Sequence, residues 1–363
     1  NAVVAAVDAG RGIVQYPTGT GKTLILAGAV ALLRVPTLIL CDKRDLLRQL
    51  AEQIERTLGV EPGVIGDGVW QPQGVTVGTF QTLTRRLLST QPAAHNYRQE
   101  AIDYLASVQA VLVDEGHHID ARTFERVLRA TPNAYYRLAF SATPFRSDDP
   151  GTRLRVTGWT GPVVALQTLT EAIEGGRVVP ADIFIVKLDG PPTVALNYRA
   201  EYEAGCVQNA ERNSIIRTLA SKIEGAGVIL VESLAHGQLL SERTGLPFVY
   251  GGLPMKARTA YWEGFRQGHL HGLIVSKIGD EGLDLPNLRW LILAAGGRAP
   301  HRQVQRIGRG MRSSEGKERL TVFDFTDQGK YLGSHYRRRR RLYEAEPAYT
   351  VCDVELAWFG GKP

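Results

Sequence analysis

Short apolar runs recur along the chain, each followed by polar or glycine-rich residues and then by a stretch with helical spacing. In the first half the runs are Gly12–Val14, Pro36–Cys41, Val75–Thr79, Ala110–Val113 and Tyr136–Phe140. In the second half they are Val228–Val231, Phe248–Tyr250, Leu273–Val275, Trp290–Leu293 and Leu320–Phe323. Continuous apolar strands between helices are typical of parallel sheets. The pattern predicts an α/β fold with two mainly parallel sheets flanked by helices, and ligands at the carboxyl ends of the strands.

Between the two series, residues 150–180 contain several glycines and prolines. They predict a hinge with a short helix inside it. Residues 42–50, with Asp42 as N-cap, and residues 256–266 have the pattern of helices. The chain therefore reads as two similar α/β lobes, which amounts to a duplication at the scale of a domain.

The segment Pro17–Thr23, PTGTGKT, stands between the first apolar run and a helix start. Glycines let backbone N–H groups surround phosphate oxygens, and a helix N-terminus adds its positive dipole end. Lys22 would reach the β- and γ-phosphates of a nucleotide, and the Thr23 hydroxyl would bind Mg²⁺. Tyr16 replaces the first glycine of the usual pattern. The predicted nucleotide-binding residues are Thr18, Gly19, Thr20, Gly21, Lys22 and Thr23.

An acidic pair, Asp114 and Glu115, directly follows the fourth apolar run. In the same lobe as Lys22 and Thr23, Asp114 would bind Mg²⁺ and Glu115 would act as the general base that activates water. His117 and His118 could suggest zinc, but no third histidine or cysteine is suitably spaced.

A second basic segment, QVQRIGRGMR at 303–312, belongs to the second series. If it is helical, Gln305, Gly308, Arg309 and Arg312 share one face because they are three or four residues apart. Arg309 and Arg312 would then be arginine fingers that reach a γ-phosphate from the second lobe. A solvated basic helix is the alternative.

The composition adds modest limits. The chain has 363 residues, 44% of them hydrophobic and 22% charged, and a net charge of +6. That length suits two domains, and the charge is compatible with a polyanionic partner. No run is long enough for a transmembrane helix, and three scattered cysteines suggest a reducing compartment. Because the chain starts without Met almost inside the first strand, we expect a further N-terminal segment before Asn1.

Two other segments allow competing interpretations. Glu315–Lys317, near Asp324, could suggest a nuclease but reads as the turn before the last strand. Arg337–Arg341 is an uninterrupted basic run. It could bind phosphates or form a solvated helix beside Glu344 and Glu346, and the sequence favours neither interpretation.

Taken in order, the motifs resemble a superfamily 2 helicase or translocase of the DExH type. They are PTGTGKT, LILCDKRDLLRQ, VGTFQTL, DEGHH, SATPFR, IVSKIGDEGLDLP and QRIGRGMR. The resemblance covers residues 12–327, and the last motif is similar to DNA repair, phage recombination and restriction-type motors. It implies two RecA-like lobes with ATP and Mg²⁺ in the cleft between them. The family's adenine-reading glutamine segment lies upstream of the phosphate loop, so the base preference is left open.

The resemblance also implies roles for single residues. Ser141 and Thr143 would couple hydrolysis to lobe movement, and His117 would relay the nucleotide state. Gly282 and Asp284 would lie near the nucleotide. The residues implied in contacts with the nucleic-acid backbone are Arg44, Thr79, Gln81 and Ser276. For Arg44 a solvated helix charge, and for Thr79 a helix cap, are the plainer interpretations.

The sequence thus predicts an ATP-dependent DNA helicase of the repair or recombination kind, with DNA as partner and a cytoplasmic location. A restriction-type duplex translocase, an RNA helicase and an ATP-switched clamp are alternatives, and intact Glu115, Gln305, Arg309 and Arg312 argue against the clamp. The predicted domains are lobe 1 at 1–158, a hinge at 159–186, lobe 2 at 187–330 and a basic C-terminal extension at 331–363.

Overall fold

The fold is described from a computed structural model. It covers residues 2–42, 44–89, 95–116, 122–145, 149–190, 195–276, 285, 287–296 and 300–355. The chain divides after Leu169 into two compact units, Asn1–Leu169 and Thr170–Pro363. Each unit has its own sheet and its own core. Among the described residues, none of the helices combines the length and the apolar character needed to cross a bilayer.

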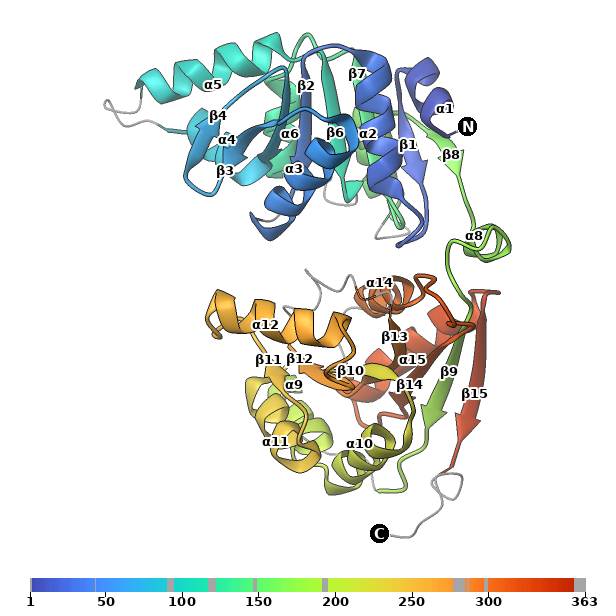
Figure 1. The fold of residues 1–363 in the computed structure, drawn as a ribbon. Coiled ribbons are helices and arrows are strands. Elements are labelled where there is room, and N and C mark those ends of the chain that lie inside the picture. Colours follow the sequence, from blue (N-terminus) through green and yellow to red (C-terminus); the bar gives the residue numbers. More distant parts are fainter. Residues whose placement is uncertain are drawn as a thin grey trace. The chain divides into compact units, whose positions relative to one another are not determined.

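The first unit is built on an eight-stranded sheet of described residues with the order β4-β3-β5-β2-β6-β7-β1-β8 (Figure 1). All neighbouring strands pair in parallel except β3 and β4, which form an antiparallel hairpin. The strands are β1 (Arg11–Gln15), β2 (Thr37–Cys41), β3 (Gly63–Gly66), β4 (Val69–Gln71), β5 (Val75–Thr79), β6 (Ala110–Asp114), β7 (Tyr136–Ser141) and β8 (Val163–Leu166).

Helices cover both faces of this sheet. On one face α1 (Ala2–Ala9), α2 (Lys22–Leu33) and α3 (Arg44–Leu58) pack on the strands through one apolar cluster. The other face is covered by α4 (Phe80–Leu87), α5 (His95–Ser107), α6 (Arg122–Arg129) and α7 (Pro150–Thr160). Because both faces are buried, the central strands are apolar at almost every position, as parallel strands in such a fold must be.

The second unit contains a seven-stranded sheet of described residues in which every pairing is parallel, with the order β11-β12-β10-β13-β14-β9-β15. The strands are β9 (Ala181–Val186), β10 (Ala226–Leu230), β11 (Phe248–Val249), β12 (Gly272–Val275), β13 (Leu288–Leu293), β14 (Leu320–Phe325) and β15 (Tyr349–Val354). Strand β9, the first strand of this unit in the sequence, lies between β14 and the edge strand β15.

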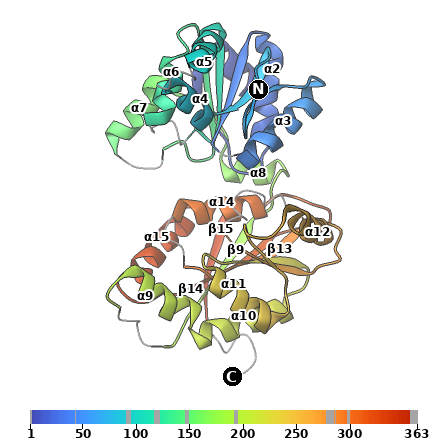
Figure 2. The same ribbon diagram turned by 90° about the vertical axis from the view of Figure 1, so that its left-hand side faces the viewer.

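The helices of the second unit are α9 (Tyr198–Tyr202), a π-helical turn η3 (Glu203–Val207), α10 (Ala210–Lys222), α11 (Leu234–Thr244), α12 (Met255–Arg266), α14 (Pro300–Gly310) and α15 (Leu332–Glu344). Helix α8 (Leu169–Glu174) begins where the two units meet in the sequence. Helices α10 and α11 share an apolar cluster with one face of the sheet. Helices α14 and α15 contact each other (Figure 2). Gly310 of α14 packs on Leu320 of β14. Leu320 lies on the opposite face of that strand from Phe323, because the two residues are three apart.

The predicted fold class is confirmed, because two parallel-dominated sheets flanked by helices are present. The predicted strands all exist, with ends shifted by one or two residues. Five strands were not predicted: β3, β4, β8, β9 and β15. Strand β8 pairs with β1 and β9 pairs with β14, so part of the segment expected as a hinge completes the two sheets. The three boundaries between the four predicted domains stay a prediction.

Candidate active site

The loop between β1 and α2 has the geometry of an anion cradle. Gly19 and Gly21 take left-handed φ angles of 88° and 91°, which side chains with a Cβ rarely adopt. Helix α2 begins at Lys22, two residues earlier than the apolar pattern suggested. The Thr20 hydroxyl donates to the Pro17 carbonyl at 2.8 Å and tightens the loop. The N-terminus of α2 is therefore directed into the loop, as a phosphate site requires.

Lys22 lies on the inside of this loop. Its side chain is buried, and its Nζ donates to the carbonyls of Tyr16 and Pro17, both at 3.3 Å. These carbonyls hold the ammonium group at the start of the loop. Tyr16 thus contributes its backbone, which explains why a residue other than glycine can stand there. Lys22 is the charged residue of the segment Pro17–Thr23, so its ammonium group supplies the full positive charge of the loop.

The strand order brings the other candidate residues of the first unit to the same edge. Strands β6, β7 and β1 are adjacent, with Asp114 in register with Phe140, and Ser141 in register with Gln15. Neighbouring strands lie about 4.8 Å apart. The acidic pair, Ser141 and the phosphate loop therefore leave the sheet at one edge and within three neighbouring strands.

Glu115 has an unusual backbone. It is a non-glycine residue with a φ of 54°, in the left-handed region. Such a conformation costs of order 1 kcal/mol or more and is concentrated at functional sites. Glu115 turns the chain sharply after Asp114, the last residue of β6. Both side chains are half-buried. His117, for which a relay role was expected, lies outside the described residues.

Ser141 and Thr143 stand next to the phosphate loop. Ser141 is fully buried, and its Oγ accepts a hydrogen bond from the backbone N–H of Thr143 at 3.2 Å. The Ser141 carbonyl accepts one from the N–H of Tyr16, also at 3.2 Å. The last residue of β7 is therefore hydrogen-bonded both to the first residue after β1 and to Thr143.

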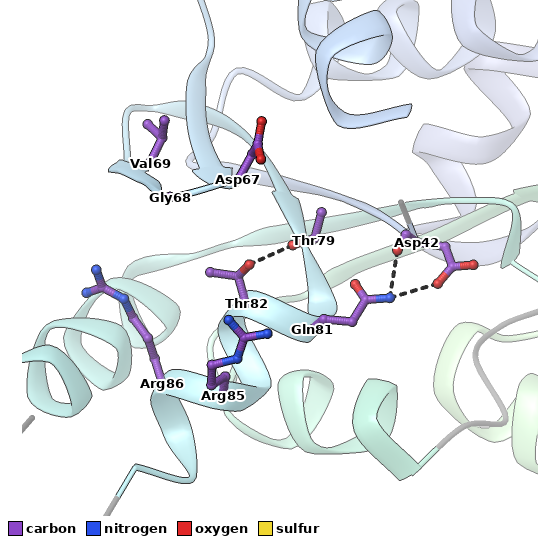
Figure 3. A pocket seen from close by; sticks show the side chains of 9 residues that line it. All are labelled: Asp42, Asp67, Gly68, Val69, Thr79, Gln81, Thr82, Arg85 and Arg86. Atoms are coloured by element: carbon purple, nitrogen blue, oxygen red, sulfur yellow. Dashed lines mark hydrogen bonds between the residues drawn. The ribbon is translucent and has the colours of Figure 1, made fainter. Parts of the chain in front are cut away.

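A pocket of about 460 Å³ lies at the same edge of the sheet, near β5 and β2 (Figure 3). Gln81 lines this pocket. Its Nε2 donates to the backbone carbonyl of Asp42 at 2.6 Å and to the Oδ1 of Asp42 at 2.8 Å. Thr79 is buried and its hydroxyl donates to that of Thr82 at 2.9 Å. The expected nucleic-acid residues Thr79 and Gln81 thus line one pocket. Arg44 is the first residue of α3, and its side chain is not described.

The pocket also contains two arginines that the sequence analysis did not single out. Arg86 is fixed, because its guanidinium lies 3.7 Å from the centre of the Trp70 ring and pairs with Glu100 at 3.1 Å. Arg85 is exposed and makes no ion pair with any described residue. Its charge is therefore available to a phosphate group. The doublet Arg85-Arg86, separated from the FQTL segment by Thr84 alone, was the available sequence signal.

In the second unit, Gln305 and Arg309 lie on α14 and are both half-buried. Arg312 does not share their helical face as expected, because α14 ends at Gly310. Arg312 instead forms an isolated antiparallel bridge with Val178. Beside this bridge, the Val179 N–H donates to the Met311 carbonyl at 2.7 Å. The two arginines therefore come from different local structures.

Ser276 follows β12 directly and is buried, with its backbone N–H donating to the Val249 carbonyl at 3.1 Å. It stands at the carboxyl edge of the second sheet, as the sequence pattern predicts. Gly282 and Asp284, expected near the nucleotide, lie outside the described residues.

Sequence reasoning missed Lys317. This lysine is buried, and its Nζ donates to the carbonyls of Gly310 at 2.5 Å and Arg312 at 2.9 Å. It closes the C-terminal end of α14. Burial, assisted by the nearby Arg289, lowers the pKa of Lys317 to about 8. The turn Glu315–Lys317 carries a structural cation, and its only sequence signal is a lysine between a glycine and a strand.

The five-arginine run forms part of α15 and fits neither earlier interpretation as a whole. Arg339 is buried and pairs with Asp324 at 2.8 Å and Asp327 at 2.9 Å. Arg340 pairs with Asp353 at 2.6 Å. Arg337, Arg338 and Arg341 are exposed. Within the run, Arg339 therefore binds buried aspartates in the core, Arg340 forms a surface ion pair, and the other three arginines are solvated.

The donor set of the first unit fits ATP with Mg²⁺. The glycine loop and the start of α2 present backbone N–H groups to phosphates. The Thr23 hydroxyl, in the first turn of α2, and the Asp114 carboxylate are the hard oxygen ligands that Mg²⁺ prefers. Lys22 and Thr23 are consecutive, so both side chains leave the first helical turn beside the loop.

Comparisons with known proteins agree with this geometry. Residues 2–146 match the family model described as type III restriction enzyme, res subunit, and residues 210–314 match the helicase conserved C-terminal domain. A protein of Halobacterium salinarum, provisionally named DNA 3′–5′ helicase Rad25, is 29% identical over 358 residues, or 92% of this chain. The DNA 3′–5′ helicase XPB of Kineococcus radiotolerans is 26% identical over 360 residues, or 96% of this chain.

The chain spans 54% and 62% of the lengths of these two relatives. Among solved structures, the ATP-dependent type ISP restriction-modification enzyme LlaBIII bound to DNA has the same fold, with a TM-score of 0.67. That match covers 98% of this chain and 31% of the other, with 13% sequence identity. The first family match lies within the first compact unit, and the second match lies within the second unit.

Proposed function

Because the chain belongs to superfamily 2 of the helicases, we propose that it is a nucleic-acid-dependent ATPase that moves along DNA in the 3′–5′ direction. The observation that carries the proposal is the shared edge of β6, β7 and β1, where the phosphate loop, the acidic pair and Ser141 meet. The names of the two relatives support DNA as the substrate and give the direction of movement.

In this proposal each residue of the first lobe has one task. Thr18, Gly19, Thr20 and Gly21 surround the phosphates with N–H groups, and Lys22 neutralises charge on the β- and γ-phosphates. Thr23 and Asp114 would hold Mg²⁺, which when bound offsets the charge that develops on the phosphate oxygens. Glu115 accepts the proton of the attacking water.

The second lobe completes the site when ATP closes the two lobes. Arg309 and Arg312 then contribute positive charge to the γ-phosphate, and Gln305 contributes to orienting the attacking water. Gly282 and Asp284 contact the nucleotide. His117, Ser141 and Thr143 convert the loss of the γ-phosphate into movement between the lobes.

The nucleic-acid track consists of Arg44, Thr79 and Gln81 on the first lobe and Ser276 on the second. Contacts of this kind go to phosphate and sugar and carry no base information. The pocket beside Gln81 supplies space and a further guanidinium, that of Arg85, for the backbone. An intracellular location belongs to the same proposal, because ATP and DNA are both found there.

The test measures the ATPase rate with single-stranded DNA, duplex DNA, forked DNA and RNA, together with strand displacement on substrates with a 3′ or a 5′ overhang. We expect stimulation by single-stranded DNA and displacement only from the 3′ overhang. Stimulation by RNA alone would replace the DNA assignment. ATP binding without turnover on any substrate would favour the clamp.

A restriction-type duplex translocase is the second candidate, favoured by the family match of residues 2–146 and by the fold of LlaBIII. It predicts ATPase stimulation by duplex DNA and displacement of a third strand from a triplex, without separation of the duplex. Strand displacement and triplex displacement, measured on the same preparation, distinguish the two candidates.

A further inference from the structure

The chain segment that leads into α14 is held by two buried arginines. Strand β13 ends at Leu293, residues 294–296 follow it, and α14 begins at Pro300, four residues after Gly296. Arg212 Nη1 donates to the Ala294 carbonyl at 3.0 Å, and Arg339 Nη1 donates to the Gly296 carbonyl at 2.6 Å. Both arginines are at most 1% exposed. Their contacts go to the backbone, so they fix the path of the chain.

Two aspartates hold these arginines in place. Arg339 binds Asp324 through Nε at 2.8 Å and Asp327 through Nη2 at 2.9 Å, and Arg212 binds the other oxygen of Asp327. Two positive and two negative charges balance, which a buried ionic cluster needs. Gly296 fits tightly against the cluster, because a Cβ there would lie 2.8 Å from Asp327 Oδ2.

A third buried cation holds the other end of α14. Lys317 donates to the carbonyls of Gly310 and Arg312, which are the last residue of the helix and the second residue beyond it. The last carbonyls of a helix lack partners within it, and a cation is favoured there by the helix dipole. Lys317 therefore fixes the position of Arg312 as well as the end of α14.

These contacts fix the chain just before α14, at Ala294 and Gly296, and at the C-terminal end of the helix. We propose that Arg212, Arg339 and Lys317 are positioning residues that hold α14 at both ends, so that Arg309 and Arg312 reach ATP in one defined geometry. The inference rests on the proposed function. A displacement of about 1 Å in a reacting arrangement can lower a rate about 100-fold. The surface ion pair of Arg340 on α15 with Asp353 should not have this effect, because among the described residues neither side chain is hydrogen-bonded to the chain at an end of α14.

The main test compares Lys317→Met, Lys317→Arg and Arg339→Lys with two matched controls. Lys330→Met removes an exposed lysine of the same unit, and Arg340→Lys changes the arginine next to Arg339 on α15. The readouts are kcat and KM for ATP with saturating single-stranded DNA, and the thermal midpoint. We expect Lys317→Met and Arg339→Lys to lower kcat about 10- to 100-fold with KM for ATP within about twofold of the parent.

Lys317→Arg should recover most of the rate, because it restores a cation, and both controls should match the parent. A loss of kcat that disappears on cooling, in step with recovery of the folded fraction, would reduce the three residues to a purely structural role and overturn the proposal. Parental kcat in folded Lys317→Met would overturn it as well.

A second measurement separates this inference from the proposed function. Amide hydrogen exchange over residues 300–312 reports how firmly α14 is held, whether or not the protein hydrolyses ATP. We expect faster exchange in Lys317→Met at the C-terminal turn and in Arg339→Lys at the N-terminal turn, with the rest of the second unit unchanged. If the parent lacks stimulated ATPase activity, the proposed function fails, and unchanged exchange in both variants overturns the positioning inference independently.

Discussion

At the scale of single residues, Lys22 has the clearest consequence. Its ammonium group lies inside the phosphate loop, bound to the carbonyls of Tyr16 and Pro17. We expect Lys22→Ala to abolish hydrolysis and to weaken ATP binding at least tenfold, because the loop then offers phosphates only neutral donors. Binding of a fluorescent ATP analogue and phosphate release measure the two effects.

Lys256→Ala is the matched control, since Lys256 is exposed on α12 of the other unit. Near-parental turnover by Lys22→Ala would remove Lys22 from the site.

Glu115 is expected to behave differently from Lys22. Glu115→Gln keeps the shape of the side chain and leaves the Asp114 carboxylate in place, but it removes the proposed general base. The variant should therefore bind ATP and DNA like the parent while its turnover falls by ~10² or more. Glu61→Gln, at an exposed loop position, provides the control. A rate within a few-fold of the parent would mean that another group activates the water.

His236 predicts a pH dependence of stability. It is buried and its Nε2 lies 2.9 Å from Asn213 Oδ1, and burial, with a smaller effect of Arg212, lowers its pKa to about 3. The unfolded chain takes up this proton near pH 6.5, so the contribution of the neutral ring to stability is present above pH 6.5 and is lost as the pH falls towards 3. At pH 4 the loss is about 3 kcal/mol.

Urea unfolding between pH 4 and pH 7 measures this effect. His236→Gln should flatten the fall in the free energy of unfolding relative to the parent, even if the variant is less stable at every pH. His269→Gln, which changes an exposed histidine, should leave the slope unchanged. Equal slopes for His236→Gln and the parent would show that His236 does not carry this dependence.

At the scale of elements, the proposed mechanism assigns the coupling between the lobes to α14 and the residues just beyond it. Arg309→Ala and Arg312→Ala should each lower the DNA-stimulated ATPase rate by ~10³ and leave ATP binding by the first lobe nearly unchanged. Arg266→Ala, on the exposed end of α12, is the control. A variant with full stimulated turnover would identify its arginine as a solvated charge, which is the alternative that an arginine-rich helix always allows.

The central elements of both lobes were predictable, because buried parallel strands have apolar runs and helices between them. The unpredicted strands lack that signal. Strands β3 and β4 have four and three residues, and β8 and β9 lie in or beside a segment rich in glycine and proline. Strand β15 is exposed at several positions because it is an edge strand. Its sequence therefore shows no continuous apolar run.

The candidate site divides in the same way. The phosphate loop, the acidic pair and Ser141 each lie at or directly after the end of an apolar strand. They can therefore be found in the sequence, and the order of the parallel strands then places them at one edge of the sheet. The cluster of Arg212, Arg339, Asp324 and Asp327 joins α10, α15 and β14 across more than 100 residues, and no local pattern reports such a pairing. One signal was present: Leu332, Tyr336, Arg339 and Tyr343 have the spacing of a buried helical stripe, which places one arginine of the run on the core side.

At the scale of the whole molecule, the proposed motor works only if DNA and ATP act on the same closed arrangement of the two lobes. Arg44, Thr79 and Gln81 belong to the first lobe and Ser276 to the second, so a strand bound to all four favours closure. In the proposed mechanism, closure would also bring Arg309 and Arg312 to ATP. Binding energy from DNA therefore appears as a higher kcat for ATP hydrolysis.

This coupling makes the stimulation dependent on salt. Contacts with DNA phosphates release counterions, so the affinity falls steeply as salt rises, with a slope set by the number of phosphates neutralised. We expect the DNA concentration that gives half-maximal ATPase stimulation to rise with salt as a straight line on logarithmic axes. The unstimulated rate should change little. Phosphate release, measured from 50 to 200 mM salt with a DNA titration at each step, tests both expectations.

Arg85 refines the same measurement, because it is the exposed guanidinium in the pocket beside Gln81. Arg85→Ala should reduce the salt slope by about one phosphate contact and leave the maximal stimulated rate unchanged. Arg337→Ala, at an exposed position on α15 of the other unit, should keep the parental slope. If both variants keep the parental slope, DNA binds the first lobe elsewhere than in this pocket. If the parent shows no salt dependence at all, the coupling of closure to phosphate contacts is wrong.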